Sequence, residues 1–465
     1  MTFSSALSNA LSGMNAATTA IQVRGHNIAN ATTPGYARRD VELTARGPNG
    51  GVLIDVDRAE ARRLHASALA AGSASAEAGA RADAASALSE LLGAPGQTNG
   101  LYAALSGFER TLADLAATPE SPAQQQRLLS AAQTLASTFG RLGDEAQAMR
   151  VQADDRIATG TARVNDALRA LDALNRRVEQ GGLSPLPEER DAHLDAIAEE
   201  IGIQVTTLDD GRVRVATTGG VPLLGEAPRL LAFAPRGAIE AGQSLANGDL
   251  SGLSAGGIDL TPGAVQGVRG GQIAAAFAVR DADVPAFAAR VDALAEDVAG
   301  RLASADQDAG GQGLLTVTSG PGAASSVRVN AGVDPSQGGA LWRLRDGLAA
   351  TTAGPSAGAG VLPGLLAALD APASVPGATG GPGPVSASGA VERLASSLGT
   401  ESLVADTRAV ASGARAMAAR DDLLQATGVN TDDELQAILL IEQAYAANAR
   451  VVQAVSDMMQ RLTEI

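Results

Sequence analysis

The C-terminal end of the chain carries an apolar repeat that limits how the chain can fold. Residues at alternating steps of three and four are Ile438, Ile441, Tyr445, Asn448, Val452, Val455, Met459 and Leu462. This spacing places their side chains on one face of a helix and is typical of a coiled-coil seam. Asn448, the polar member, resembles the core asparagine that sets coiled-coil register. An amphipathic helix packed on its own domain would give a similar stripe.

The N-terminal end carries a matching repeat. Its strict alternation of four and three consists of Leu7, Leu11, Met14, Thr18, Ile21, Gly25 and Ile28. Thr18 and Gly25 weaken this seam because neither adds a large apolar side chain. The repeat predicts a helix over residues 1–30, which should end near Asn30 because Thr-Thr-Pro-Gly-Tyr follows. Matched seams at both ends predict that the termini share one coiled-coil layer.

The apolar composition favours close-packed helices over a large sandwich. Hydrophobic residues make up 45% of the 465 residues, but aromatic residues make up only 2%. The core must therefore be built mainly from Ala, Leu and Val. We find no apolar run of the roughly 18 residues that a transmembrane helix needs. The first residues lack the basic and apolar regions of a cleaved secretory signal.

Missing residue types exclude several kinds of chemistry. The sequence contains no Cys and no Lys, so disulfides, thiolate nucleophiles, Schiff-base lysines and a P-loop are excluded. Its three His lie far apart, at positions 26, 65 and 193. The formal net charge of −16 argues against nucleic acid and against a polybasic membrane contact. We therefore expect no enzyme, no cofactor and no metal.

Helical periodicity covers most of the chain outside its middle. It runs from about residue 59 to 177, with breaks at 93–96 and 118–120, and Ser121-Pro122 is a good helix start. A short helix is expected over 187–201, another helical stretch over 273–304, and helix from 391 onward with one interruption. Thr431-Asp432-Asp433-Glu434 reads as a capping box at the start of the last helix.

The middle of the chain reads as β-like and rich in Gly. Alternating apolar residues predict hairpins around Pro48-Asn49-Gly50-Gly51 and around Asp209-Asp210-Gly211. Residues 216–272 and 310–390 are rich in Gly and Pro, and 372–389 reads as a linker. The fold class is therefore mainly α with a β-rich, Gly-rich middle region and terminal helices that form a coiled-coil layer.

This organisation predicts discontinuous domains. Residues 1–45 and 421–465 should form the terminal coiled-coil domain. Residues 46–202, 273–304 and 391–420 should form a helical domain. Residues 203–272 and 305–390 should form a β-rich, loop-rich outer region.

Both ends of the chain also carry recognisable motifs. The N-terminal motif runs from Ala6 to Ala17 and then from His26-Asn27-Ile28-Ala29-Asn30 through Thr33-Pro34-Gly35-Tyr36 to Arg39. It resembles the signature of flagellar rod, hook and hook-associated proteins. The segments Gly428–Asn430 and Glu442–Val451 are similar to the closing helix of the same family. The segment Leu112–Phe139 is similar to the helical domain of hook-associated members.

The resemblance implies a structural part of the bacterial flagellum at the junction between hook and filament. It implies self-assembly into a ring or helical lattice, with the hook protein and the next hook-associated protein as neighbours. It also implies export through the flagellar type III apparatus to the cell exterior without a cleaved signal, and a chaperone on the C-terminal helix. The two seams are the expected assembly interface.

Two alternatives remain open, and an enzyme is a third class that the residues do not support. A hook or rod protein of the same family shares the N-terminal motif, although hook proteins are mostly β where residues 59–177 read as helical. A coiled-coil adhesin or scaffold would not need Thr-Pro-Gly-Tyr after its first helix. For an enzyme, the best acidic cluster is Asp306-Gln307-Asp308, which lacks calcium ligands at the required later positions and reads as a solvated turn. Glu199-Glu200 reads as helix-surface charge.

Overall fold

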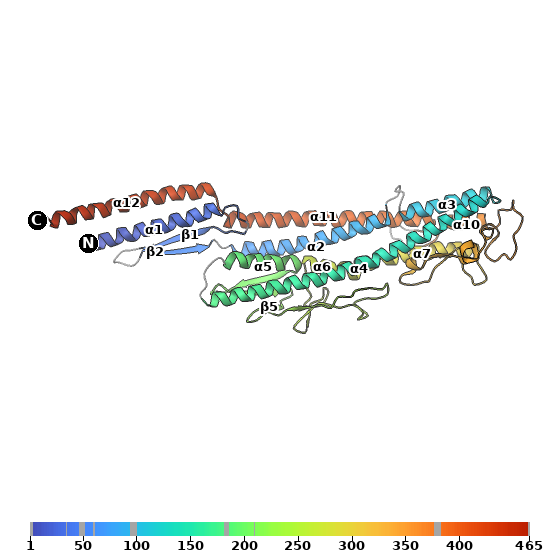
Figure 1. Ribbon diagram of the computed structural model, residues 1–465, viewed down its shortest axis with the longest axis horizontal. Helices are drawn as coiled ribbons and strands as arrows, with labels where there is room; N and C mark the ends of the chain where they lie inside the picture. Colours follow the sequence, from blue (N-terminus) through green and yellow to red (C-terminus); the bar gives the residue numbers. More distant parts are fainter. Residues whose placement is uncertain are drawn as a thin grey trace.

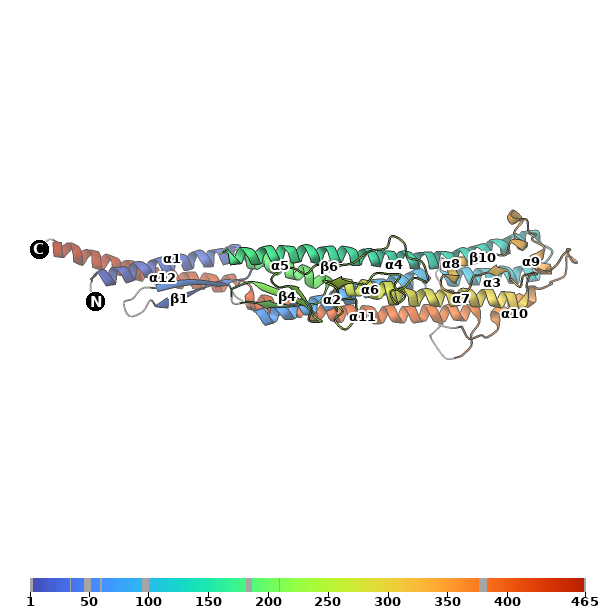
Figure 2. The ribbon, with the colours of Figure 1, turned by 90° about the horizontal axis from the view of Figure 1, so that it is seen from below.

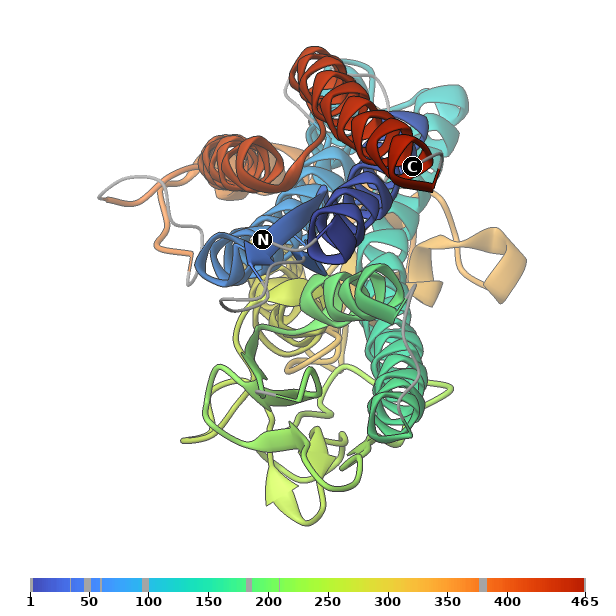
Figure 3. The ribbon, with the colours of Figure 1, turned by 90° about the vertical axis from the view of Figure 1, so that its left-hand side faces the viewer.

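The protein is an elongated molecule in which both termini lie at the same end (Figure 1). The computed structural model describes residues 3–33, 35–45, 52–58, 61–93, 100–180, 186–208, 210–375 and 383–463. Two long helices at one end continue into a helical body (Figure 2), and the loop-rich region of residues 216–270 lies on the side of the body away from α12 (Figure 3). No described helix combines the length and apolar character needed to cross a bilayer.

The terminal layer consists of α1 (Phe3–Ala29), α12 (Thr431–Thr463) and a hairpin of β1 (Arg39–Ala45) and β2 (Val52–Arg58). α1 and α12 run antiparallel (Figure 1), which confirms the expected pairing of the two terminal helices. The hairpin is antiparallel in the register Val41 to Val56, as predicted, and its turn lies outside the described residues. The domain boundary expected after residue 45 is wrong in one respect, because it cuts through this hairpin.

The helical body is built on four long helices: α2 (Arg62–Leu92), α3 (Leu101–Ala117), α4 (Pro122–Glu179) and α11 (Ala387–Thr427). α4 has 58 residues and is therefore about 87 Å long. The Ser121 hydroxyl accepts a hydrogen bond from the backbone N–H of Gln124 at 3.3 Å, with Pro122 in the first helical turn. The predicted helix start and the break at 118–120 are thus confirmed, while residues 94–99 lie outside the described ranges.

α2 and α11 pack along nearly their whole lengths, antiparallel and through small residues. The line of α11 that is most buried beyond Leu398 is made of Ser402, Ala405, Ala409, Ser412, Ala416 and Ala419. An ideal Cβ at Gly413 would lie 3.8 Å from the Ser75 hydroxyl of α2. Because α11 continues unbroken to Thr427, the domain boundary expected between residues 420 and 421 falls inside a helix and is wrong there.

Shorter helices complete the body. α5 (Leu186–Glu200) confirms the helix predicted over 187–201, and α6 (Gly271–Ala278) and α7 (Val284–Ala305) confirm the one over 273–304. A π-helical turn, η1 (Val279–Asp283), joins α6 to α7. One core cluster gathers α3, the first half of α4, α7 and α10 (Leu362–Asp370), and a second gathers the later half of α4, α5 and α6.

The predicted β material is confirmed between α5 and α6. β3 (Ile203–Thr207), β4 (Val213–Thr217) and β5 (Pro222–Leu224) form one antiparallel sheet in the order β3-β4-β5. β6 (Leu231–Ala232), β7 (Ser254–Ala255) and β8 (Ile258–Asp259) form a second. Asp209 of the predicted turn lies outside the described residues.

The expectation that residues 305–390 are β-rich is wrong. Their described strands are β9 (Leu315–Thr316) and β10 (Arg328–Val329), and the rest is coil with α10 and short turns. Those turns are α8 (Ala323–Ser326), η2 (Ala331–Val333), η3 (Pro335–Gln337) and α9 (Arg343–Asp346). Leu344, Leu362 and Leu365 are buried in the first core cluster. The segment therefore packs its apolar residues on the helices, mainly as coil and short turns.

A buried ion pair fastens the loop-rich region to the helices. Arg280, in the π-helical turn, donates to the Asp154 carboxylate of α4 at 2.5 Å, and both side chains are fully buried. Arg280 also donates to the Ser251 carbonyl and lies 4.8 Å from the Phe277 ring centroid. Asp154 accepts a second hydrogen bond from the Arg236 backbone N–H at 2.6 Å. This ion pair thus joins α4, the π-helical turn and the loop that contains Arg236 and Ser251.

Candidate assembly interface

The contact between α1 and α12 is built on a stripe of small residues. Ala10, Ala17 and Ala20 of α1 are buried, and Gly13 lies between them on the same line. An ideal Cβ at Gly13 would lie 2.7 Å from Asn448 Nδ2, so the asparagine side chain occupies the space that glycine leaves. The contacts of Gly13 with Asn448 and of Arg24 with Glu434 fix an antiparallel register.

Glu434 closes this interface at the end where α12 begins. Its carboxylate is buried, with 1% of the side chain exposed, and Oε2 accepts from Arg24 Nη1 at 3.0 Å. Oε1 accepts from Asn27 Nδ2 at 3.1 Å. A buried carboxylate is tolerated only where it is paired and hydrogen-bonded. The terminal layer therefore depends on the two helices being together.

Asn27 ties the helix pair to the hairpin. Its Nδ2 also donates to the Arg39 carbonyl at 2.8 Å, and its Oδ1 accepts from the Arg39 N–H at 3.0 Å. The Tyr36 hydroxyl donates to the same Oδ1 at 2.8 Å. Two donor and two acceptor positions of one amide are thus used. Asn27 and Tyr36, both within the N-terminal motif, are residues that the seam analysis did not select.

The surroundings of Tyr36 favour its neutral, donating form. Burial raises the pKa of the Tyr36 phenol, Arg39 lowers it, and the carboxylates of Glu188 and Glu434 raise it further. The raised pKa keeps the hydroxyl proton available for Asn27.

The terminal layer also joins the body directly. The Arg38 N–H donates to the Thr427 carbonyl at the end of α11 at 2.7 Å. Arg39 lies 3.8 Å from the Glu188 carboxylate of α5. The loop after α1 is therefore held between the last turn of α11 and the start of α5.

The capping box expected at Thr431–Glu434 is wrong. Asn430 caps the helix instead, since its Oδ1 accepts from the Asp432 N–H at 3.1 Å. Glu434 turns away from the helix start because a guanidinium and an amide of α1 offer it stronger partners.

The predicted seam residues of α12 lie along its contact with α1, to different depths. Val455 is buried at 5% exposure, and Ile438, Ile441, Asn448 and Val452 are half-buried. Tyr445 and Met459 are exposed at 39% and 51%, and the Leu462 side chain lies outside the described part.

The predicted seam residues of α1 flank the contact line instead of forming it. Leu7, Met14, Ile21 and Ile28 are half-buried, and Leu11 is 47% exposed. Their place at the centre is taken by Ala10, Gly13, Ala17 and Ala20, which alternate in the same steps of three and four. Small residues let the backbones approach, so the large side chains stand at the sides of the contact.

α12 carries a second apolar seam that nothing in the described structure covers. Leu440, Ala444, Ala447, Val451, Ala454 and Met458 also alternate in steps of four and three, and every one is exposed. Leu440, Val451 and Met458 are 67%, 43% and 42% exposed. Apolar residues at this spacing on one helix face require a helical partner. This face was not predicted from the sequence. Three of its six residues are Ala, so its apolar pattern is weaker than that of the first seam.

We predict that a large side chain at Gly13 pries α1 and α12 apart. Gly13→Leu should lower the stability of the terminal layer by about 1–3 kcal/mol because Asn448 fills the space, and Asn448→Ala should restore part of it. Amide exchange of α12 measures the loss. Gly25→Leu is the matched control, since a Cβ there would meet nothing within 4 Å. Equal amide protection of α12 in both variants would contradict the close approach of α1 and α12 at Gly13.

The acidic candidates have structural partners. The Asp308 carboxylate accepts from the backbone N–H groups of Gly310 and Gln312, as expected of a turn. Glu200 was expected to be surface charge, but it is 1% exposed and pairs with Arg156 and Arg163 of α4 at 2.9 and 3.1 Å. Within the described residues, no group of three His, Cys, Asp or Glu could hold a metal ion.

Two family models match parts of this chain. Residues 85–314, from the end of α2 to beyond α7, match the model described as the flagellar hook-associated protein FlgK helical domain. Residues 420–465, which contain α12, match the model described as the flagellar basal body rod FlgEFG protein C-terminal region. The chain is therefore similar to flagellar hook-associated proteins in its helical body and to flagellar rod-family proteins in its C-terminal helix.

Curated relatives carry the same description. Flagellar hook-associated protein 1 of Escherichia coli (strain K12) is 24% identical over 252 residues, which cover 50% of this chain and 46% of the relative. The protein of the same name from Salmonella typhimurium is 25% identical over 252 residues and covered to 45%. The chain thus spans about half the length of the curated relatives it matches.

Among solved structures, the flagellar hook junction protein FlgK from Burkholderia pseudomallei is similar, with 22% identity and a TM-score of 0.45. The match covers 56% of this chain and 47% of that one.

Proposed function

We propose that this protein is a structural component of the bacterial flagellum that forms the junction between hook and filament by self-assembly through its terminal helices. The observation that carries the proposal is the second seam of α12, an exposed line of apolar residues beside the seam that faces α1. A helix with two seams can pack against two partners at once. α1 is one partner, and a neighbouring subunit is the other.

The names of the relatives support the place of this assembly. Proteins called hook-associated protein 1, and one titled a hook junction protein, resemble this chain. The neighbours in the flagellum would then be the hook protein on one side and the next hook-associated protein on the other. The role is mechanical and needs no catalytic group.

The same surface supports the proposed route of the chain. Exposed apolar residues on α12 would promote premature assembly inside the cell, so an export chaperone would cover 438–462 until the chain leaves through the type III apparatus. The terminal layer of α1, the hairpin and α12 forms one proposed domain. The helices of the body form a second, and the loop-rich region forms the outer one.

Replacing three residues of the second seam tests the proposal. Leu440→Ser, Val451→Ser and Met458→Ser together should abolish assembly on isolated hooks, because they remove the apolar face offered to the neighbour. Thermal unfolding of the monomer should hardly change, since all three are exposed. The matched control is Leu435→Ser with Leu439→Ser, two exposed residues on another side of α12. Normal assembly of the triple variant would overturn the role of this seam.

A further inference from the structure

α11 carries an exposed apolar line on the body, separate from the terminal seams. Leu403, Val410, Met417 and Leu424 recur every seven residues, and they are 66%, 66%, 71% and 49% exposed. This line, here called the ridge, extends over 21 residue steps of helix, or about 31 Å. A line of exposed large apolar residues on one helix face, interspersed with Asp406 and Asp421, is a candidate interaction surface.

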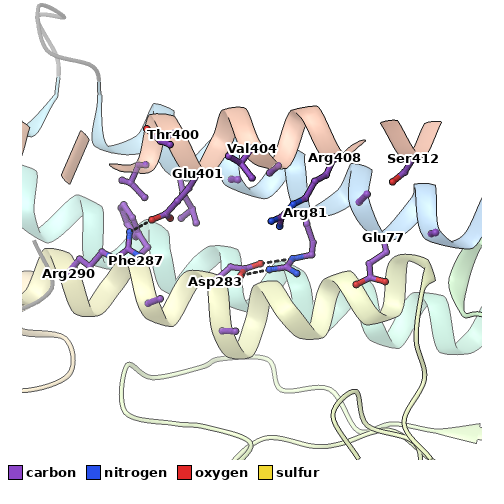
Figure 4. A pocket seen from close by; sticks show the side chains of 18 residues that line it. Glu77, Arg81, Asp283, Phe287, Arg290, Thr400, Glu401, Val404, Arg408 and Ser412 are labelled. Atoms are coloured by element: carbon purple, nitrogen blue, oxygen red, sulfur yellow. Dashed lines mark hydrogen bonds and ion pairs between the residues drawn. The ribbon is translucent and has the colours of Figure 1, made fainter. Parts of the chain in front are cut away.

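The body also has a groove between α2, α7 and α11, with a volume of about 830 Å³ (Figure 4). Ala74, Ala78, Ala85 and Leu88 of α2 line it with small and apolar side chains. Two ion pairs brace its helices: Arg81 to Asp283 at 2.8 Å and Arg290 to Glu401 at 2.7 Å. These pairs connect α2 and α11 to the η1–α7 segment across the groove.

Ridge and groove lie on different sides of α11. Val404 and Arg408 line the groove, whereas Leu403 and Val410 point away from it, by the 100° step of a helix. One molecule therefore offers both surfaces outward at once. Two different surfaces that fit each other produce head-to-tail contacts, which close into rings or grow into helical assemblies.

Arg408 in the groove and the carboxylates beside the ridge carry opposite charges, although the groove also holds Glu77. Arg408 points into the groove and makes no ion pair within the described part of the chain (Figure 4). Asp406 and Asp421 stand beside the ridge, and neither makes an ion pair within the described residues. A neighbouring ridge laid in the groove would supply Arg408 with a carboxylate. The ridge also leads to Thr427, which joins the terminal layer through Arg38, so it continues the proposed assembly surface.

We propose that the groove between α2, α7 and α11 receives the ridge of α11 from a second copy of this chain, forming a head-to-tail lateral contact. The inference rests on the proposed function, which places copies of the chain side by side. It adds a second interface, in the body, to the contact made by the terminal helices.

Cysteine crosslinking tests this contact, because the chain has no Cys of its own. Ala414→Cys places a thiol on the exposed ridge side, and Ala286→Cys places one at the groove wall on α7. Both are small changes at exposed positions, and circular dichroism verifies the fold. Val265→Cys, at a fully exposed loop position, is the control. The variants are oxidised singly and in mixtures, in isolated flagella and in the concentrated purified chain.

A mixture of the two single variants should give a disulfide-linked dimer, the double variant should give a ladder of oligomers, and each variant alone should give little. Crosslinks within the ridge variant alone would show a two-fold contact and overturn the head-to-tail arrangement. Crosslinks no more frequent than with Val265→Cys would overturn the interface. Hook-end assembly without ridge–groove crosslinks would overturn this inference and keep the proposed function. Ridge–groove crosslinks in a chain absent from hook ends would overturn the proposed function and keep this inference.

Discussion

Replacing Glu434 by alanine should uncouple α1 from α12. The change removes the buried carboxylate that Arg24 and Asn27 share, so that Arg24 keeps only the exposed Asp40 at 3.3 Å and Asn27 Nδ2 keeps only the Arg39 carbonyl. Loss of one partner from a buried ion pair costs about 3–5 kcal/mol, and the 21% exposure of Arg24 places this case near the lower end. Amide exchange should rise along both terminal helices.

The neighbouring residue provides the control for this variant. Asp433→Ala removes a carboxylate from the same helical turn, but Asp433 is exposed. Its contribution is limited to the helix dipole, about 0.3–1 kcal/mol. If both variants changed exchange equally, Glu434 would act only through the helix start, and the contact described here would be wrong.

Replacing Asp154 by alanine should destabilise the body by about 3 kcal/mol, because it leaves the fully buried Arg280 without the carboxylate of α4. This is the lower end of the range for a broken buried pair, since Arg280 still pairs with Asp281 at 2.8 Å. The Arg236 N–H also loses its acceptor. Urea unfolding followed by circular dichroism measures the change, and protease should cut the 234–253 segment sooner.

A surface ion pair gives the matched comparison. Arg81→Met breaks the ion pair with Asp283. The side chains of Arg81 and Asp283 are 43% and 27% exposed, so the free energy of unfolding should fall by only about 0–1 kcal/mol. A loss of similar size in both variants would contradict the view that Asp154 and Arg280 hold the loop-rich region to the helices.

The sequence predicted elements whose signal is local. The seam of α12, the helix start at Ser121 and the hairpin that ends at Thr217 each depend on spacing, capping or turn residues within one segment. The pairing of the termini was also predicted, because each end of the chain carries its own apolar seam. The family resemblance rests on the N-terminal motif around Asn27 and Tyr36, on the closing helix and on the segment Leu112–Phe139.

The features that the sequence did not predict depend on contacts between distant segments. Glu434 looked like a capping residue because its partners, Arg24 and Asn27, lie over 400 positions away in the chain. The contact line of α1 was missed because Ala10, Gly13 and Ala17 are too small to dominate an apolar pattern. Their spacing of three and four was nevertheless readable. For residues 305–390 the sequence predicts β structure wrongly, because Gly and Pro mark turns without telling whether strands or coil connect them.

Electron microscopy of hook ends tests the central claim most directly. A strain lacking this chain should make hooks without attached filaments, the full chain should restore them, and the variant with Leu440→Ser, Val451→Ser and Met458→Ser should not. That pattern would place the chain at the hook–filament junction and its second α12 seam in the assembly. Filaments attached normally in the strain lacking the chain would contradict the account.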